Sequence, residues 1–98
     1  MMTKVLKLRK IEKEMIANLL FPKSEVLNSR FEIDDRNEDL SKALVFGTVE
    51  HQKVRIAFEG VEGRKEVETT IWGVTSSEVI LKQNVVIPIH RIVKIEIL

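Results

Sequence analysis

The sequence predicts a mainly β, α+β domain in which two N-terminal helices pack on a small five-stranded barrel. Two observations predict this fold class. Apolar residues follow a helical spacing up to about residue 47 and a strand-like alternation from Val49 onward. Several later strands are apolar on both faces, so each face needs a cover, the barrel interior on one side and the helices on the other. The 98 residues fit one domain, with a helical part at 1–47 and the barrel at 48–98.

The first helix is predicted over residues 3–20. An apolar stripe with helical spacing passes through Val5, Leu8, Met15 and Leu19. Pro22 ends this helix, because the residue before a proline avoids the helical region. We expect an irregular segment to follow, over residues 23–33.

The second helix is predicted to be shorter and to end at Gly47. Asp35 is placed to cap its start, with Glu38 three residues later, as in a capping box. An apolar face follows, formed by Leu40, Ala43 and Leu44. Gly47 is expected to end the helix in the left-handed conformation that glycine tolerates.

Five strands are predicted in the barrel half of the chain. They are residues 53–59, 65–75, 78–82, 85–87 and 92–98. Gly60 and Gly63 frame a hairpin turn, and Gly73 marks a bend or bulge in the long second strand. Pro88 ends the fourth strand, and a tight turn at 89–91 leads into the last one. Closure into a barrel would leave no exposed sheet edge.

The chain also resembles known families. The strand order, the stretch IPIHRI before the last strand and the preceding helix resemble SH3-like and Sm-like barrels. The segments DLSKALVFG, KVRIAFEG, EGRKEVETTIWGVTSSEVILK and IPIHRI, within residues 39–97, are similar to a family of small uncharacterised bacterial proteins with no assigned activity. The Sm-like resemblance implies RNA binding or ring assembly. The chain departs from the Sm-like pattern in its first turn, where Glu62 and Gly63 replace an Asp-Gly pair.

Composition and charge narrow the possible functions. The chain has no cysteine, and its 16 basic and 15 acidic groups give a net charge of +1. We therefore expect neither a disulfide frame nor a dedicated nucleic-acid binder, which would be strongly basic. No segment predicts a signal peptide or a membrane helix, and we expect a cytoplasmic location. A cationic block at residues 1–10 and an acidic block at 32–39 are expected to contact each other or stay solvated.

No catalytic or metal-binding motif is found in the sequence. The four glycines are too scattered for a phosphate-binding loop, and no Gly-x-Ser-x-Gly motif is present. His51 and His90 are the only histidines, and their positions do not match the spacings of metal sites. The sequence therefore predicts a protein that is not an enzyme and that holds no metal or cofactor.

The candidate residues for a binding surface are Trp72, His90, Arg91 and Lys94. We expect Trp72 to be buried beneath the helices, whereas an exposed Trp72 would stack on a base or hold a peptide. The His90 ring, in the tight turn, is expected to bond a backbone carbonyl. Arg91 and Lys94 are candidates for a basic patch that holds phosphates, joined by Lys53, Arg55 or Lys82.

Two hypotheses follow for the function. The first is a non-enzymatic interaction module that acts through protein–protein contacts or self-association. It follows from the apolar residues on both faces of the strands, the near-neutral charge and the absence of catalytic motifs. The alternative is a weak RNA-binding Sm-like module that uses Trp72, Arg91, Lys94 and the cationic start of the chain.

Overall fold

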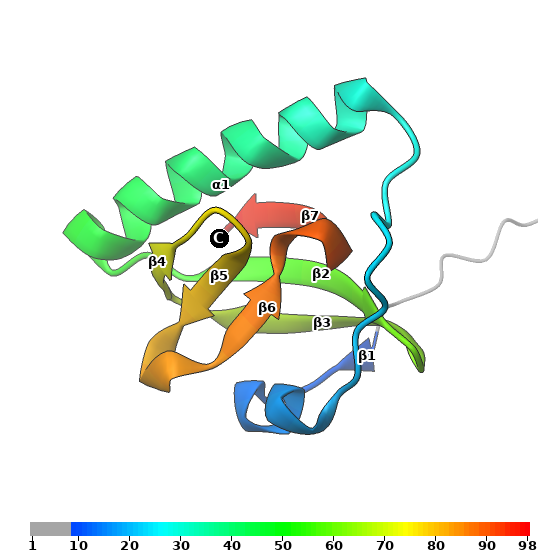
Figure 1. Ribbon diagram of the computed structural model, residues 1–98. Coiled ribbons are helices and arrows are strands. Elements are labelled where there is room, and N and C mark those ends of the chain that lie inside the picture. Colours follow the sequence, from blue (N-terminus) through cyan, green and yellow to red (C-terminus); the bar gives the residue numbers. More distant parts are fainter. Residues whose placement is uncertain (1–8) are drawn as a thin grey trace, which may run out of the picture.

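The computed structural model describes residues 9–98, except the side chain of Thr48, and within them shows one long helix and seven strands in two sheets (Figure 1). The helix, α1, spans Arg30–Glu50. The strands are β1 (Arg9–Lys10), β2 (Val54–Gly60), β3 (Gly63–Thr69), β4 (Ile71–Val74), β5 (Glu78–Leu81), β6 (Val86–Pro88) and β7 (Ile92–Ile97). Three short 3-10 turns complete the list: η1 (Lys13–Asn18), η2 (Lys82–Asn84) and η3 (Ile89–Arg91).

The strands form two separate sheets. The first has the order β1-β3-β2-β7, in which β1 runs parallel to β3 and the other pairs are antiparallel. The second is an antiparallel sheet with the order β4-β5-β6. The chain passes from one sheet to the other at Thr70, between β3 and β4. In Figure 1, α1 lies above both sheets, and it contacts β4 of one sheet and β7 of the other.

The predicted closed five-stranded SH3-like or Sm-like barrel is wrong. The strand predicted at 65–75 breaks at Thr70, so its two halves belong to different sheets, and both sheets remain open. β1 adds a further strand beside β3. The opening between β4 and β7 is spanned by α1, and η1 contacts β3 and β6 on another side. The helix and the 3-10 turn therefore cover the openings between the sheets that strand closure was predicted to seal.

Strand positions follow from local alternation and are largely confirmed. In β2, Val54, Ile56 and Phe58 are fully buried, as the period-two pattern predicts. The hairpin turn is confirmed too, because Gly60 pairs with Gly63, whose φ is 113°. The predicted irregularity near Gly73 appears as a register shift between Ile71 and Gly73.

Helix α1 begins earlier and ends later than predicted. Its N-cap is Ser29, whose Oγ accepts a hydrogen bond from the Glu32 backbone N–H at 3.1 Å, so Asp35 is not the cap. Gly47 does not end the helix. Gly47 packs against β4, where an added Cβ would lie 2.5 Å from the Ile71 carbonyl oxygen. The left-handed C-cap is His51, with φ 55° and ψ 32°.

The predicted helix at 3–20 is wrong over its described part, and residues 3–8 lie outside the described residues. Arg9 and Lys10 pair with β3, and the Ile11 N–H continues this pairing by donating to the Glu66 carbonyl at 2.9 Å. A 3-10 turn follows and buries the side chain of Ile16, which is 1% exposed. Backbone pairing to β3 and the burial of Ile16 therefore override the helical propensity of this segment.

The core lies between the two sheets and under α1. Both sheets contribute side chains to it, and Leu40 and Ala43 add the inner face of α1. Its remaining fully enclosed members are Ile16, Val54, Ile56, Phe58, Val67, Ile71, Val79, Leu81, Ile87, Ile92 and Ile95. Burying each such side chain contributes about 1.5–3 kcal/mol before the entropy cost of ordering the chain.

A buried arginine anchors the first half of α1. Arg36 is 4% exposed, and its Nη1 and Nη2 donate to the two carboxylate oxygens of Glu25 at 2.7 and 2.6 Å. Nη1 also donates to the Ile92 carbonyl, at the start of β7, at 3.1 Å. The hydrogen bonds from Arg36 hold the pKa of Glu25 below its ordinary value. This arginine therefore ties the segment before α1, the helix and β7 together.

We expect Glu25→Gln to lower the free energy of unfolding by about 3 kcal/mol at pH 7, because Arg36 would keep a buried charge without its carboxylate. Since the pKa of Glu25 is lowered in the folded chain, its contribution is present above the ordinary glutamate pKa and is lost as the pH falls through the lowered value. Urea denaturation should therefore show the difference between wild type and variant shrinking below about pH 4. Glu62→Gln, in the exposed turn, should stay within about 0.5 kcal/mol of wild type. A difference that stays constant from neutral to acidic pH would contradict this assignment.

Candidate functional site

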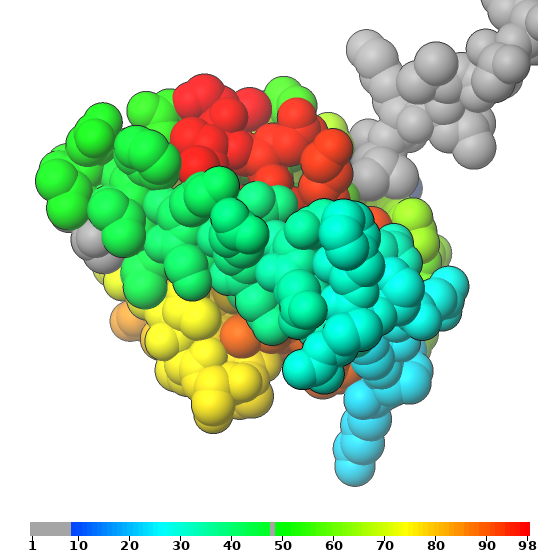
Figure 2. Space-filling model, turned by 90° about the horizontal axis from the view of Figure 1, so that it is seen from above, coloured from blue at the N-terminus to red at the C-terminus, as the bar shows by residue number. Residues whose placement is uncertain are grey.

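Helix α1 is bordered by a groove on each side. Figure 2 shows α1 crossing this face of the molecule between β7, in red, and the β4–β5 turn, in yellow. On the side of the turn lies a groove of about 310 Å³, which we call the neutral groove. Its lining residues are Asn37, Leu40, Ser41, Leu44, Val74, Thr75, Ser76 and Ile89. On the side of β7 lies a second groove of about 280 Å³, which we call the acidic groove.

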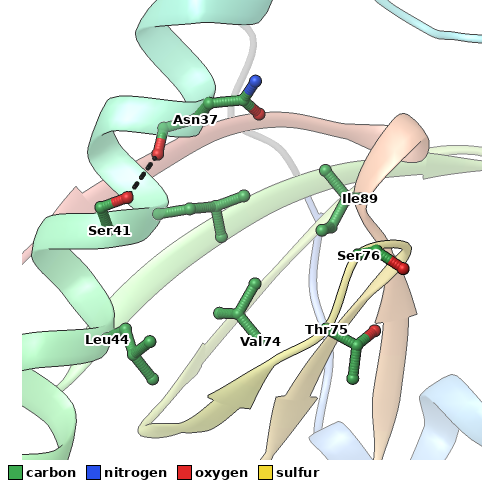
Figure 3. A pocket seen from close by; sticks show the side chains of 8 residues that line it. Asn37, Ser41, Leu44, Val74, Thr75, Ser76 and Ile89 are labelled. Atoms are coloured by element: carbon green, nitrogen blue, oxygen red, sulfur yellow. Dashed lines mark hydrogen bonds between the residues drawn. The ribbon is translucent and has the colours of Figure 1, made fainter.

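The neutral groove has an apolar floor and a polar rim (Figure 3). The spacings of three and four residues place Asn37, Leu40 and Leu44 on the same side of α1. Val74 and Ile89 face them from β4 and η3. The side chains of this floor are apolar, and every rim side chain is an uncharged amide or hydroxyl. Such a lining suits an apolar group flanked by hydrogen-bonding atoms.

Two of the four rim side chains already have partners. The Ser41 hydroxyl donates to the Asn37 carbonyl at 3.2 Å. The Thr75 hydroxyl accepts from the backbone N–H groups of Ser77 and Glu78, at 3.3 and 3.0 Å, and so shapes the β4–β5 turn. Among the described residues, the Asn37 amide and the Ser76 hydroxyl make no hydrogen bond. These two groups are therefore free to bond a ligand.

The acidic groove is lined by carboxylates. Glu32, Asp35 and Asp39 line it from α1, and Val93 and Lys94 line it from β7. Arg36 also lines it, but its guanidinium is engaged by Glu25 and by the Ile92 carbonyl. Within the described residues, no group of three or more His, Cys, Asp or Glu side chains is arranged to hold a metal ion.

Trp72 is 50% exposed, so the prediction that the helices bury it is wrong. It lies on β4 at the register shift between Ile71 and Gly73. Strand alternation there directs Ile71 into the core, where it is 0% exposed, and leaves Trp72 outside. α1 packs against β4 at the backbone of Ile71 and does not bury the Trp72 side chain.

His90 and Arg91 hold the chain segment that links η1 to α1, residues 19–29. The His90 ring nitrogen Nε2 bonds the Pro22 carbonyl at 2.9 Å, which confirms the predicted bond to a backbone carbonyl. Arg91 is 5% exposed and donates to the carbonyls of Ser24 and Glu59, each at 2.9 Å. Arg91 also contacts the Glu59 carboxylate at 3.2 Å. Both side chains therefore have structural partners.

The structure does not bring the predicted basic patch together. Arg91 is buried, whereas Lys94 is exposed beside the carboxylates of the acidic groove. Arg55 lies on the outer face of the first sheet, within 3.2–3.9 Å of carboxylate oxygens of Glu66, Glu68 and Glu96. Hydrogen bonds from Lys10 and Arg55 lower the pKa of Glu68. The cations nearest the predicted site thus already have acidic neighbours.

The residues of the neutral groove were missed by sequence reasoning. Asn37, Ser41 and Leu44 share one side of α1, and that spacing was visible in the sequence. Their partners across the groove, Thr75 and Ser76, are more than 30 residues away along the chain. Only the position of α1 across the two sheets brings these parts together.

Comparison with protein-family models, curated proteins and solved structures finds no match to this chain. In the part of the chain that the structure describes, no helix is long and apolar enough to cross a membrane.

We expect Arg91→Met to lower the free energy of unfolding by about 3 kcal/mol, because the carbonyls of Ser24 and Glu59 would lose their buried donor. Lys94→Met is the matched control, since Lys94 is an exposed cation three residues away, and it should change stability by less than about 0.5 kcal/mol. Chemical denaturation measures both. Equal, small effects of the two substitutions would show that Arg91 is not the structural anchor assigned to it.

Proposed function

We propose that the chain is a non-enzymatic interaction module that acts in the cytoplasm through protein contacts, with the neutral groove as its binding site. The observation that supports this function is the lining of that groove. Leu40, Leu44, Val74 and Ile89 offer an apolar floor, while Asn37 and Ser76 offer hydrogen-bonding groups on opposite sides. An apolar side chain of a partner peptide would enter the floor, and its backbone would bond the two rim groups.

The size and charge of the groove favour a peptide side chain as its occupant. A volume of about 310 Å³ is at the lower end of the range for ligand sites and suits one or two side chains. No ionisable side chain lines the groove, so it offers no cation to a phosphate group and no titratable group for acid–base chemistry. The cysteine-free composition is compatible with a reducing cytoplasm.

We do not propose RNA binding. That alternative depended on Arg91, Lys94 and Trp72 as a common surface. Arg91 already donates hydrogen bonds to the carbonyls of Ser24 and Glu59. Lys94 borders the acidic groove, whose carboxylates would repel phosphates. Trp72 lies on β4, in the other sheet. Nothing in the described part of the chain favours RNA binding over protein binding.

A random-peptide display library, selected on the folded wild-type protein, tests the proposed function. We expect enriched peptides that share an apolar anchor residue. Their affinity should fall about tenfold or more for Ser76→Tyr, because the tyrosine ring would fill the groove. Ser77→Tyr is the matched control: this neighbouring serine is also exposed but does not line the groove, and affinity should be retained.

Two results would contradict the proposed function. The first is a library selection that enriches no peptide above an unrelated protein. The second is a set of enriched peptides whose affinity is the same for Ser76→Tyr and for Ser77→Tyr, because binding would then lie elsewhere on the surface. Circular dichroism of both variants checks that each retains the fold.

A further inference from the structure

Helix α1 carries apolar side chains on its outer face as well as on its inner face. Phe31 and Val49 are 74% and 72% exposed, although the opposite side of the helix buries Leu40 and Ala43 in the core. Figure 2 looks onto this outer face, and no described segment lies over it. A surface that covered both side chains would remove their apolar area from water, which is favourable.

The exposed residues form a seam along the helix. At 100° of rotation per residue, Phe31, Glu38, Lys42 and Val49 fall within about 40° of one another on the side away from the core. The seam therefore has an apolar residue at each end and two opposite charges in the middle, and the exposed side chains of Asp35 and Val45 border it between these points. Glu38 and Lys42 are both largely exposed, with side chains at 67% and 58%, and lie 3.4 Å apart within the same helix.

We infer that a second copy of this chain packs along the seam, with the two α1 helices antiparallel. The two-fold axis that relates them passes between the helices, at the level of residue 40 along α1. In that arrangement residues whose numbers sum to 80 lie at the same level. Phe31 then meets the partner's Val49, and Glu38 meets the partner's Lys42, each pair occurring twice. The apolar ends cover each other, and the four central charges alternate in sign.

Charge complementarity selects the antiparallel arrangement. A parallel pair in the same register would place Glu38 against Glu38 and Lys42 against Lys42, and like charges at an interface are repulsive. The antiparallel pair places each of these residues nearest to the opposite charge. An antiparallel second copy is thus complementary to this seam at its two ends and at its centre, while Asp35 lies level with the partner's Val45 between them.

The length of the seam sets the geometry and strength of the contact. Phe31 and Val49 are about 27 Å apart along the helix axis, so the two helices must cross at a small angle, about 20°, for both ends to touch. The contact is small compared with stable dimer interfaces, and we expect a dissociation constant between about 10 µM and 1 mM. The neutral groove lies on another side of α1 and stays open, so this inference does not depend on the proposed function.

Sedimentation equilibrium at low ionic strength tests the inference. The wild-type protein should change with concentration from the chain mass of 11.3 kDa toward twice that value. Glu38→Lys and Lys42→Glu should each raise the dissociation constant about tenfold or more, because each places like charges together at the axis. A 1:1 mixture of the two variants should form a heterodimer. One variant then has lysine at positions 38 and 42, and these lysines face the glutamates that the other variant has at both positions.

The mixture separates an intermolecular effect from an intramolecular one. Mixing cannot restore the Glu38–Lys42 pair within either helix, so recovery of the dimer reports contact between copies. Phe31→Asp should also abolish the dimer, and Val61→Asp, at an exposed turn position (58% exposed), should not. A wild-type mass of 11.3 kDa at every concentration, or a mixture that stays monomeric, would overturn the proposal.

Discussion

The close approach of α1 to the edges of both sheets is the constraint on which the rest of the structure depends. Near its C-terminal end, Gly47 lies so close to β4 that a Cβ would be 2.5 Å from the Ile71 carbonyl oxygen. In its first half, Arg36 donates to the carbonyl of Ile92 at the start of β7. These two contacts fix the helix across the opening between sheets that do not pair with each other there. Leu40 and Ala43, between them, then close the core.

The same placement decides which surfaces remain for binding. Because the inner face of α1 is occupied by the core, the helix meets solvent along its outer seam and along the two grooves at its sides. The groove toward the β4–β5 turn is uncharged, whereas the one toward β7 is acidic. Two arginines that were candidates for a basic patch have partners within the fold instead: Arg91 holds residues 19–29, and Arg55 is surrounded by carboxylates on the outer face of the first sheet. Arg36, which was not a candidate, also holds this segment through Glu25.

Local patterns were sufficient to predict most strands and failed where distant parts of the chain decide the structure. The alternation of Val54, Ile56 and Phe58 predicts β2, and Gly60 with Gly63 predicts its turn, because both depend on near neighbours.

The break at Thr70 has no local signal and turns the expected barrel into two open sheets. The helix expected at 3–20 was predicted from helical propensity and spacing. The pairing of Arg9 and Lys10 with β3 outweighs that propensity. The pattern Ser29-x-x-Glu32 was a readable cap, and it was passed over for Asp35. The candidate site was harder to predict, since no sequence pattern shows that Arg91 is bonded to Ser24 or that Ser76 and Asn37 line one groove.

Nuclear Overhauser effects between α1 and β4 test this account most directly. Because Gly47 packs against Ile71, its Hα protons should show cross-peaks to protons of Ile71 and of its neighbour Trp72 in the folded protein. Cross-peaks from Ala43 methyl protons to core side chains of both sheets should accompany them. A spectrum of the folded chain in which Gly47 shows contacts only within its own helix would contradict the placement of α1, and with it both the grooves and the seam.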